Sequence, residues 1–303
     1  MSAMLIDGKA LAAEYRSRIA ARAKAVQARG GAVRLDALLI DSGDNAALQY
    51  AENQGKTCAE LGIDYRLHKL SPSSTFDDIA GRVLLLNTKD EVSAIMVHLP
   101  LPEGVDAYGV QRLIAPEKDV EGVNPANIGN IVYGRSSLAP CTALAVATMA
   151  QWVARRAWNA ENLRSRRAVV VGAGDVVGKP IAVLLMRLDA TVVSCNIWTN
   201  QEEGGLAGVT RSADLLVAAA GVPGLITRDM VKPGAIVIDV GVNRVPGPDG
   251  KLRTVGDTDF AGVSQVTSWI SPVPGGVGPM TVAMLLRNVV EAAERTVGID
   301  AAG

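Results

Sequence analysis

The chain has 303 residues, of which 49% are hydrophobic and 20% charged, and its formal net charge is −1. This composition is typical of a folded protein long enough for two domains, and it excludes an intrinsically disordered chain. Acidic and basic residues are balanced without a charged tail, so we expect neither nucleic acid nor a membrane surface as a partner. A small molecule is the expected partner.

The cysteines and histidines are too few and too scattered for a structural metal or a disulfide framework. Three cysteines, Cys58, Cys141 and Cys195, are widely spaced, and the sequence has only two histidines. We therefore predict no metal site. No apolar run reaches the roughly 18 residues of a membrane span, and the first residues lack a signal-peptide core. These features favour a soluble, cytoplasmic protein.

Hydrophobic periodicity in the first half of the sequence alternates between the helical and the strand type. The expected elements are a helix at 8–29, a strand at 35–40, a helix at 50–61, a strand at 64–70, a helix at 75–86 and a strand at 94–99. Such alternation predicts a mostly parallel sheet. Residues 116–140 are rich in Pro, Gly and Asn, which predicts a long and functional loop.

The second half repeats the alternation. The expected elements are a helix at 141–157, strands at 168–171, 190–195, 214–220 and 235–240, and a last helix at 281–295. The fold class is therefore α/β with two domains. We predict a first domain over 1–141, a Rossmann-like, doubly wound parallel sheet over 142–278, and a C-terminal helix within 279–303 that packs back on the first domain.

A glycine turn joins the strand at 168–171 to the next helix. Gly172, Gly174 and Gly178 follow the pattern GxGxxxG. Such glycines let a diphosphate approach main-chain amides at a helix N-terminus. A tight turn without a ligand would show the same string, but the strand before it and the helix after it favour dinucleotide binding. Asp175 is expected to cap the helix, a structural role.

Several long segments carry a family resemblance. They include VHLPLP (97–102), PEKDVEGVNPANIG (116–129), VVVGAGDVVGKP (169–180) and SPVPGGVGPMTVAMLL (271–286). With them the chain resembles the bifunctional methylenetetrahydrofolate dehydrogenase/methenyltetrahydrofolate cyclohydrolase family over nearly its whole length. The resemblance implies a homodimer, with folate in a cleft between the domains and NADP on the second domain. The family oxidises 5,10-methylenetetrahydrofolate by hydride transfer and hydrolyses the methenyl product to 10-formyltetrahydrofolate.

The resemblance also implies which residues form the sites. The catalytic positions are Tyr50, Gln54, His98 and Glu121. The folate-binding set contains these four together with Val97, Leu99, Pro272, Pro274, Gly275 and Gly276. The nucleotide-binding set is Thr142, Gly172, Ala173, Gly174, Asp175, Val177, Gly178, Ile197 and Val242.

Three catalytic positions depart from the family pattern. Gln54 replaces a lysine, His98 a glutamine and Glu121 an aspartate. A lysine of lowered pKa can carry protons, which hydrolysis requires, whereas an amide cannot. Hydride transfer depends mainly on positioning, and His98 offers an imidazole for acid–base work. The other histidine, His68, is expected at an exposed strand end.

The nucleotide positions depart as well. Ala173 and Gly174 stand where the family has Arg-Ser, and Asn196, Ile197 and Trp198 stand where it has a His-Ser run. These changes remove groups that would hold a 2′-phosphate. Three alternatives therefore remain for this site: it binds NADP, it binds NAD, or it has lost its function.

Three functions follow from these departures. The first is an NAD(P)-dependent methylenetetrahydrofolate dehydrogenase with weakened or absent cyclohydrolase activity. The alternatives are a non-redox transferase that moves the one-carbon unit to another acceptor, with His98 and Glu121 as its acid and base, and a catalytically silent folate-binding paralogue.

Overall fold

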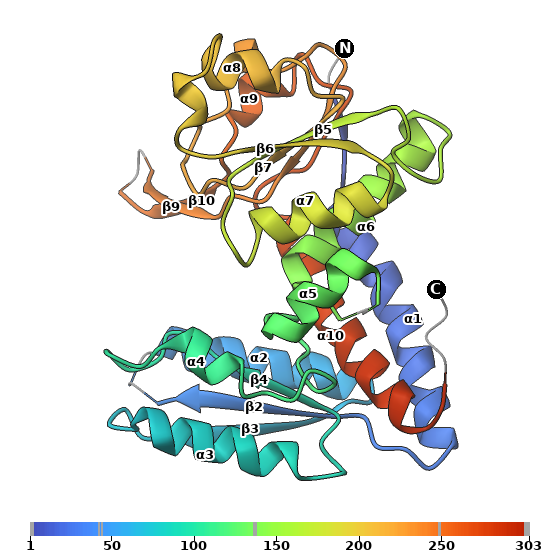
Figure 1. Cartoon of the computed structure of the whole chain (residues 1–303), viewed down its shortest axis with the longest axis vertical. Helices are drawn as coiled ribbons and strands as arrows, with labels where there is room; N and C mark the ends of the chain where they lie inside the picture. The colour runs from blue at the N-terminus through green and yellow to red at the C-terminus, as the bar shows by residue number, and fades with distance from the viewer. Residues whose placement is uncertain (1–2, 42, 44, 136–137, 248–249, 300–303) are drawn as a thin grey trace. The chain divides into compact units, whose positions relative to one another are not determined.

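The computed structural model describes residues 3–41, 43, 45–135, 138–247 and 250–299. The chain divides into two compact units, each built around its own sheet (Figure 1). The six-stranded unit comprises Met1–Ala12 and Pro140–Met284, and the three-stranded unit comprises Ala13–Ala139 and Leu285–Gly303. Two of the boundaries fall inside long helices, α1 (Gly8–Ala28) and α10 (Val277–Thr296).

This division differs from the predicted domains at the beginning of the chain. The sequence placed all of 1–141 in the first domain, whereas the first twelve residues belong to the six-stranded unit. The reason is β1 (Met4–Leu5), which pairs in parallel with β11 (Trp269–Ile270). The cleft expected between the domains stays a prediction.

The three-stranded unit is a parallel sheet with helices on both faces (Figure 1). Its strand order is β3-β2-β4, made of β2 (Arg34–Ile40), β3 (Asp64–Leu70) and β4 (Ala94–Val97). One face carries α2 (Asn45–Glu60). The other face packs through Leu38, Ile40, Ile95 and Val97 against α3 (Phe76–Asn87). Thr75 and Asp78 form a capping box that fixes the start of α3.

The predicted loop over 116–140 contains a helix, so that prediction was wrong in part. α5 (Pro125–Tyr133) begins after Asn124, whose side chain accepts a hydrogen bond from the Ala126 amide, and ends at Gly134 with φ 67°. Asn at the N-cap, Pro in the first turn and Gly at the end are helix boundaries as well as loop residues. A shorter helix, α4 (Ala107–Gln111), was also not predicted.

From Leu285 onward, α10 belongs to the three-stranded unit. The Asn288 side chain donates to the Val120 carbonyl at 2.9 Å and the Ala139 carbonyl at 3.3 Å. Arg22 on α1 forms two hydrogen bonds, of 2.8 and 2.6 Å, with the carboxylate of Glu294. These contacts join α1, α10 and the segment after β4 within one unit.

The six-stranded unit contains the doubly wound sheet that the sequence predicted. All its pairings are parallel and its order is β1-β11-β8-β7-β5-β6. The remaining strands are β5 (Arg167–Val171), β6 (Thr191–Cys195), β7 (Leu215–Ala218) and β8 (Ile236–Asp239). Since β6 and β7 lie on opposite sides of β5, the strand order reverses there, which defines a topological switch point.

Helices and a hairpin complete this unit. The helices are α6 (Cys141–Ala157), α7 (Gly178–Arg187), α8 (Gly205–Thr210) and α9 (Phe260–Val263), with 3-10 turns at Thr199–Gln201 and Arg228–Met230. The antiparallel hairpin of β9 (Asn243–Pro246) and β10 (Leu252–Val255) was not predicted. The helix expected at 281–295 begins earlier, at Val277, because Pro279 fits the first turn of a helix.

Within the described residues, no helix is both long and apolar enough to cross a bilayer.

Candidate functional site

Two of the predicted catalytic residues lie one turn apart on α2. Gln54 is buried, with 5% of its surface exposed, and its Nε2 donates to the sulfur of Met96 at 3.3 Å. Its Oε1 is buried and has no hydrogen-bond partner among the described residues. Tyr50 is half exposed, and its ring meets the ring of His98 edge to face, with centroids 6.0 Å apart. The structure therefore brings Tyr50, Gln54 and the end of β4 together.

His98 follows β4 directly and is only 6% exposed. Burial lowers the pKa of its imidazole, so the ring is neutral at neutral pH. Its Nε2 lies 3.4 Å from the hydroxyl of Tyr65, a residue of β3 that the sequence had not singled out. Burial raises the pKa of the Tyr65 phenol, which keeps it protonated.

Glu121 presents the second unsatisfied polar atom. Its Oε2 is buried and makes no hydrogen bond within the part of the chain that the structure describes. Burial and the nearby charge of Asp119 raise the pKa of Glu121 to about 7, against the effect of a hydrogen bond with the Val97 backbone. A carboxyl group with this pKa can both release and accept a proton near neutral pH.

Asp119 shapes the turn that carries Glu121. It is fully buried and accepts hydrogen bonds from the amides of Gly122 at 3.1 Å and Asn124 at 2.7 Å and from the Asn127 side chain at 2.9 Å. Burial raises the pKa of its carboxyl group, and these hydrogen bonds oppose that effect. Asp119 is therefore a structural residue, and the Asp-x-x-Gly spacing was the signal for it.

The two neighbours of His98 face in different directions. Val97 is buried in the core with Leu38 and Ile95, so only its main chain is available to a ligand. Leu99 is 55% exposed. Of these two predicted folate-binding residues, only Leu99 offers a side chain to a ligand.

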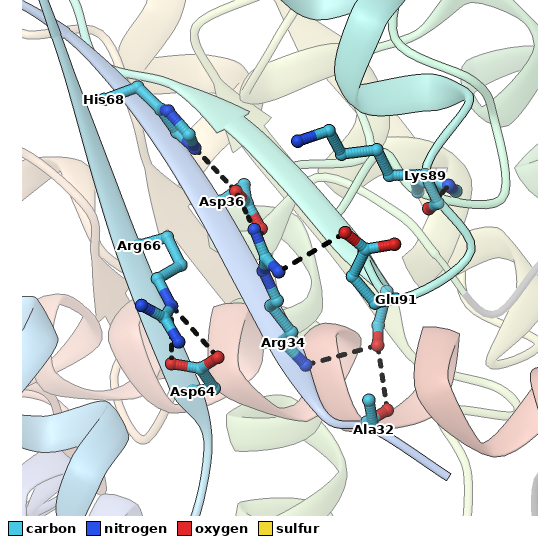
Figure 2. A network of polar contacts seen from close by, with 10 residues as sticks. Ala32, Arg34, Asp36, Asp64, Arg66, His68, Lys89 and Glu91 are labelled. Carbon is cyan, nitrogen blue, oxygen red and sulfur yellow. Dashed lines mark hydrogen bonds and ion pairs between the residues drawn. The ribbon is translucent and has the colours of Figure 1, made fainter.

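His68 is not the surface residue that the sequence predicted. Figure 2 shows it beside Asp36, and its Nε2 lies 2.6 Å from Asp36 Oδ1. Asp36 is fully buried and also accepts two hydrogen bonds from Arg34, at 2.7 and 2.9 Å. The prediction failed because β3 pairs with β2, which carries this buried carboxylate.

Two glycines in the turn of the six-stranded unit are required because the backbone leaves no room for a side chain. Gly172 has φ +114°, and a Cβ there would lie 2.1 Å from the Ala219 carbonyl oxygen at the switch point. A Cβ on Gly178 would lie 1.9 Å from the Gly172 carbonyl oxygen. Around Gly174, in contrast, no heavy atom of the described residues beyond its chain neighbours lies within 4 Å of an ideal Cβ. The turn is closed toward the sheet and open at Gly174.

The first turn of α7 offers few amides to an anion, since Lys179 donates its amide to the Gly174 carbonyl at 3.0 Å and Pro180 has no amide hydrogen. The helix begins after Val177 with no side-chain cap. The prediction that Asp175 caps this helix was therefore wrong; its carboxylate pairs with Lys179 one turn on. The positive end of the helix and the space around Gly174 still suit a diphosphate group.

The other predicted nucleotide and folate positions of this unit follow its parallel strands. Since parallel strands share one carboxyl edge, the segments after β5, β6, β8 and β11 all lie at that edge. They contribute Ala173, Ile197, Val242, Pro272, Pro274, Gly275 and Gly276. Ile197 is 80% and Val242 69% exposed. Thr142 lies in the first turn of α6.

No group of three or more His, Cys, Asp or Glu side chains in the described part of the chain is placed to hold a metal ion.

These features place the protein among two-unit α/β proteins whose larger sheet is of the dinucleotide-binding type. Comparison with known protein families identifies the family to which the chain belongs. The model of the tetrahydrofolate dehydrogenase/cyclohydrolase catalytic domain matches residues 6–121, and that of the NAD(P)-binding domain of the same family matches residues 140–297. The chain therefore belongs to the tetrahydrofolate dehydrogenase/cyclohydrolase family, and the predicted resemblance is confirmed.

Individual relatives agree with this assignment. A bifunctional protein FolD from Cupriavidus pinatubonensis is 45% identical over 298 residues, which cover 98% of this chain and 100% of the relative. The FolD methylenetetrahydrofolate dehydrogenase/cyclohydrolase structure from Campylobacter jejuni is 37% identical with a TM-score of 0.87, covering 97% of this chain and 99% of that one. The Trypanosoma brucei enzyme, solved with NADP and an inhibitor, is 32% identical with a TM-score of 0.86, covering 98% and 99%.

Proposed function

We propose that the protein is an NAD(P)-dependent dehydrogenase of 5,10-methylenetetrahydrofolate whose cyclohydrolase activity is weakened or lost. The family and the Campylobacter jejuni structure support the dehydrogenase, since the family description and the name of that structure both contain dehydrogenase and cyclohydrolase. The observation that carries the loss is Gln54, whose amide is buried beside Met96. An amide exchanges no proton in the working pH range, so it cannot serve the hydrolytic step as an amine would.

The remaining residues of the three-stranded unit suit substrate positioning. The half-exposed ring of Tyr50 offers an aromatic surface, and the unsatisfied oxygens of Gln54 and Glu121 offer acceptors for donor groups of a pterin. Buried polar atoms without partners are rare in folded proteins, which supports their use by a ligand. Positioning of this kind is what hydride transfer depends on most.

The six-stranded unit supplies the nucleotide site in this proposal. When bound, NAD(P) supplies the redox chemistry by accepting a hydride from the one-carbon unit. The glycine turn and the positive end of α7 would hold its diphosphate. Gly172 lets the strand pass close to Ala219 at the switch point, where doubly wound sheets bind nucleotides.

The charge at the end of β6 favours NAD over NADP. Between Arg187 and Arg211 the sequence contains no lysine or arginine, and Glu202 and Glu203 lie within that stretch. The charge of Glu202 contributes, after burial, to the raised pKa of Cys195 at the end of β6. A 2′-phosphate would meet negative charge without an arginine partner there.

The decisive experiment mixes the protein with 5,10-methylenetetrahydrofolate and either nucleotide and follows reduced-nucleotide absorbance. We expect formation of the reduced nucleotide, with higher kcat/KM for NAD, and slow decay of the methenyl compound. A flat trace with both nucleotides would refute the dehydrogenase. Gln54→Lys should raise methenyl hydrolysis at least tenfold. Gln49→Lys, which adds a lysine on the exposed face of α2, serves as the matched control.

We also propose a cytoplasmic homodimer. The family resemblance supports the dimer, and the buried thiols of Cys58 and Cys195 suit a reducing compartment. Light scattering of the purified protein tests the dimer, and a monomer at micromolar concentration would contradict it. Cell fractionation tests the compartment.

A further inference from the structure

The interior of α2 contains a glycine at the point where β3 packs on it. Gly55 follows Gln54, and a Cβ at this position would lie 2.8 Å from Cδ1 and 3.2 Å from Cε1 of the Tyr65 ring. Glycine in a helix interior costs about 0.5–1 kcal/mol relative to alanine. The close approach of the Tyr65 ring explains why glycine occupies this position despite the cost, because any larger residue would displace the ring.

In this position Tyr65 reaches His98. Its hydroxyl lies 3.4 Å from Nε2, while the Tyr50 ring contacts the imidazole edge to face at an interplanar angle of 87°. The two tyrosines come from different elements, α2 and β3, and hold the same imidazole. The Tyr50 ring thus fixes the orientation of the imidazole, and the Tyr65 hydroxyl is the hydrogen-bond partner of its Nε2.

A neutral imidazole has one donor nitrogen and one acceptor nitrogen, and the partner of one nitrogen decides where the proton lies. The buried phenol of Tyr65 is protonated and is a hydrogen-bond donor. When it donates to Nε2, the ring proton must lie on Nδ1. The nearby amide of Gln54 cannot exchange a proton, so acid–base work in this cluster falls to His98.

We propose that Tyr65 is a positioning residue for His98: its hydroxyl donates to Nε2, holds the ring proton on Nδ1, and reaches that place because residue 55 is glycine. The inference rests on the proposed dehydrogenase only in that it assigns acid–base work in that reaction to His98. The tautomer itself is independent of any activity. Tyr65 therefore acts through His98 and needs no contact with the substrate.

The test is ¹⁵N NMR of protein labelled at histidine, in which only two imidazoles contribute. A His98→Gln spectrum assigns the signals. We expect the wild-type His98 signals to show the Nδ1–H tautomer. Tyr65→Phe should move them toward the Nε2–H form, and Gly55→Ala should move them in the same direction because its Cβ displaces the ring. Tyr133→Phe, at an exposed position on α5, should leave them unchanged.

Two results would overturn the proposal: an Nε2–H tautomer in the wild-type protein, or a wild-type pattern retained in Tyr65→Phe. In the dehydrogenase assay, Tyr65→Phe should lower kcat about tenfold with KM little changed. Absence of dehydrogenase turnover in the wild-type protein together with the expected NMR pattern would reject the proposed function and leave the tautomer assignment intact.

Discussion

The two faces of the three-stranded sheet carry polar clusters of opposite character. On the α3 side, Arg34, Asp36 and His68 form the His68 cluster, in which the buried carboxylate has hydrogen-bond partners on both oxygens (Figure 2). On the α2 side, Tyr50, Gln54, Tyr65 and His98 form the His98 cluster, in which Gln54 Oε1 has none.

This difference assigns the His68 cluster to the stability of the fold and the His98 cluster to function. Removing one member of a satisfied buried network destabilises the fold, because the remaining charge is left without its partner. A buried acceptor without a partner costs free energy in the folded state, and a ligand can supply the missing partner. The following substitutions test this contrast.

The largest effect is expected for Asp36→Asn. It removes the charge that Arg34 and His68 surround, and breaking a buried ion pair costs about 3 kcal/mol. Arg34 stays charged without this partner, because a guanidinium is not deprotonated in proteins. Urea unfolding should show this loss, while the folded variant should keep its dehydrogenase activity. A loss of activity at full stability would reverse the roles assigned to the two clusters.

Glu121→Gln should give the next largest effect, with a pH dependence. The pKa of Glu121 is raised to about 7 from an ordinary value of 4.5, so between these values the folded protein retains a proton that the unfolded chain has released. The wild-type protein therefore loses stability as pH rises from about 4.5 to 7.

The variant lacks this titration and should be about 3 kcal/mol more stable than the wild type at pH 8, with the difference vanishing at pH 4. Thermal unfolding at both pH values measures it. Its dehydrogenase activity should fall. Equal melting temperatures across the range would show that the carboxyl group is not desolvated.

Gln54→Met should be stabilising by up to about 1 kcal/mol. It replaces a buried amide whose Oε1 lacks a partner with an apolar side chain of similar length. Urea unfolding should show a higher midpoint, and substrate KM should rise because an acceptor is lost. A destabilised variant would mean that the amide contributes to the fold, and the contrast between the faces would disappear at this position.

The smallest effect is expected for Asp64→Asn. Asp64 pairs with Arg66 at 3.0 Å, but both side chains are about half exposed (Figure 2). Exposed pairs contribute at most about 1 kcal/mol. This variant is the control for Asp36→Asn, since it removes the same charge from the same face of the sheet. A loss comparable to that of Asp36→Asn would show that burial is not what distinguishes the two pairs.

Local patterns predicted most elements of the fold. The alternation between helical and strand periodicity was sufficient to predict both parallel sheets. The helix at 141–157 has the predicted bounds. β1 was missed because two residues carry no period, and α5 was missed because its boundary residues, Asn124 and Gly134, also occur in loops.

The motifs identified Gln54, His98 and Glu121 by their positions, but not the partners of these residues. The roles of Tyr65 and Asp36 depend on which strands become neighbours and in what register, for example Leu38 opposite His68. Alternation along a strand determines which residues share a face, yet it contains no information on pairing with distant strands. Gly55 inside a helix was the one local signal of a close contact.

The path of the chain has a consequence for dissecting the protein. The chain passes from one unit to the other after Ala12, after Ala139 and after Met284, so neither unit is a continuous stretch of sequence. A fragment ending near residue 141 would carry β1 without its partner β11 and would lack the half of α10 that provides Asn288 and Glu294. Two of the passages are uninterrupted helices, so melting α1 or α10 removes packing from both units at once. We therefore expect the two units to fold and unfold together, so that the folate site and the nucleotide site form in the same folding step.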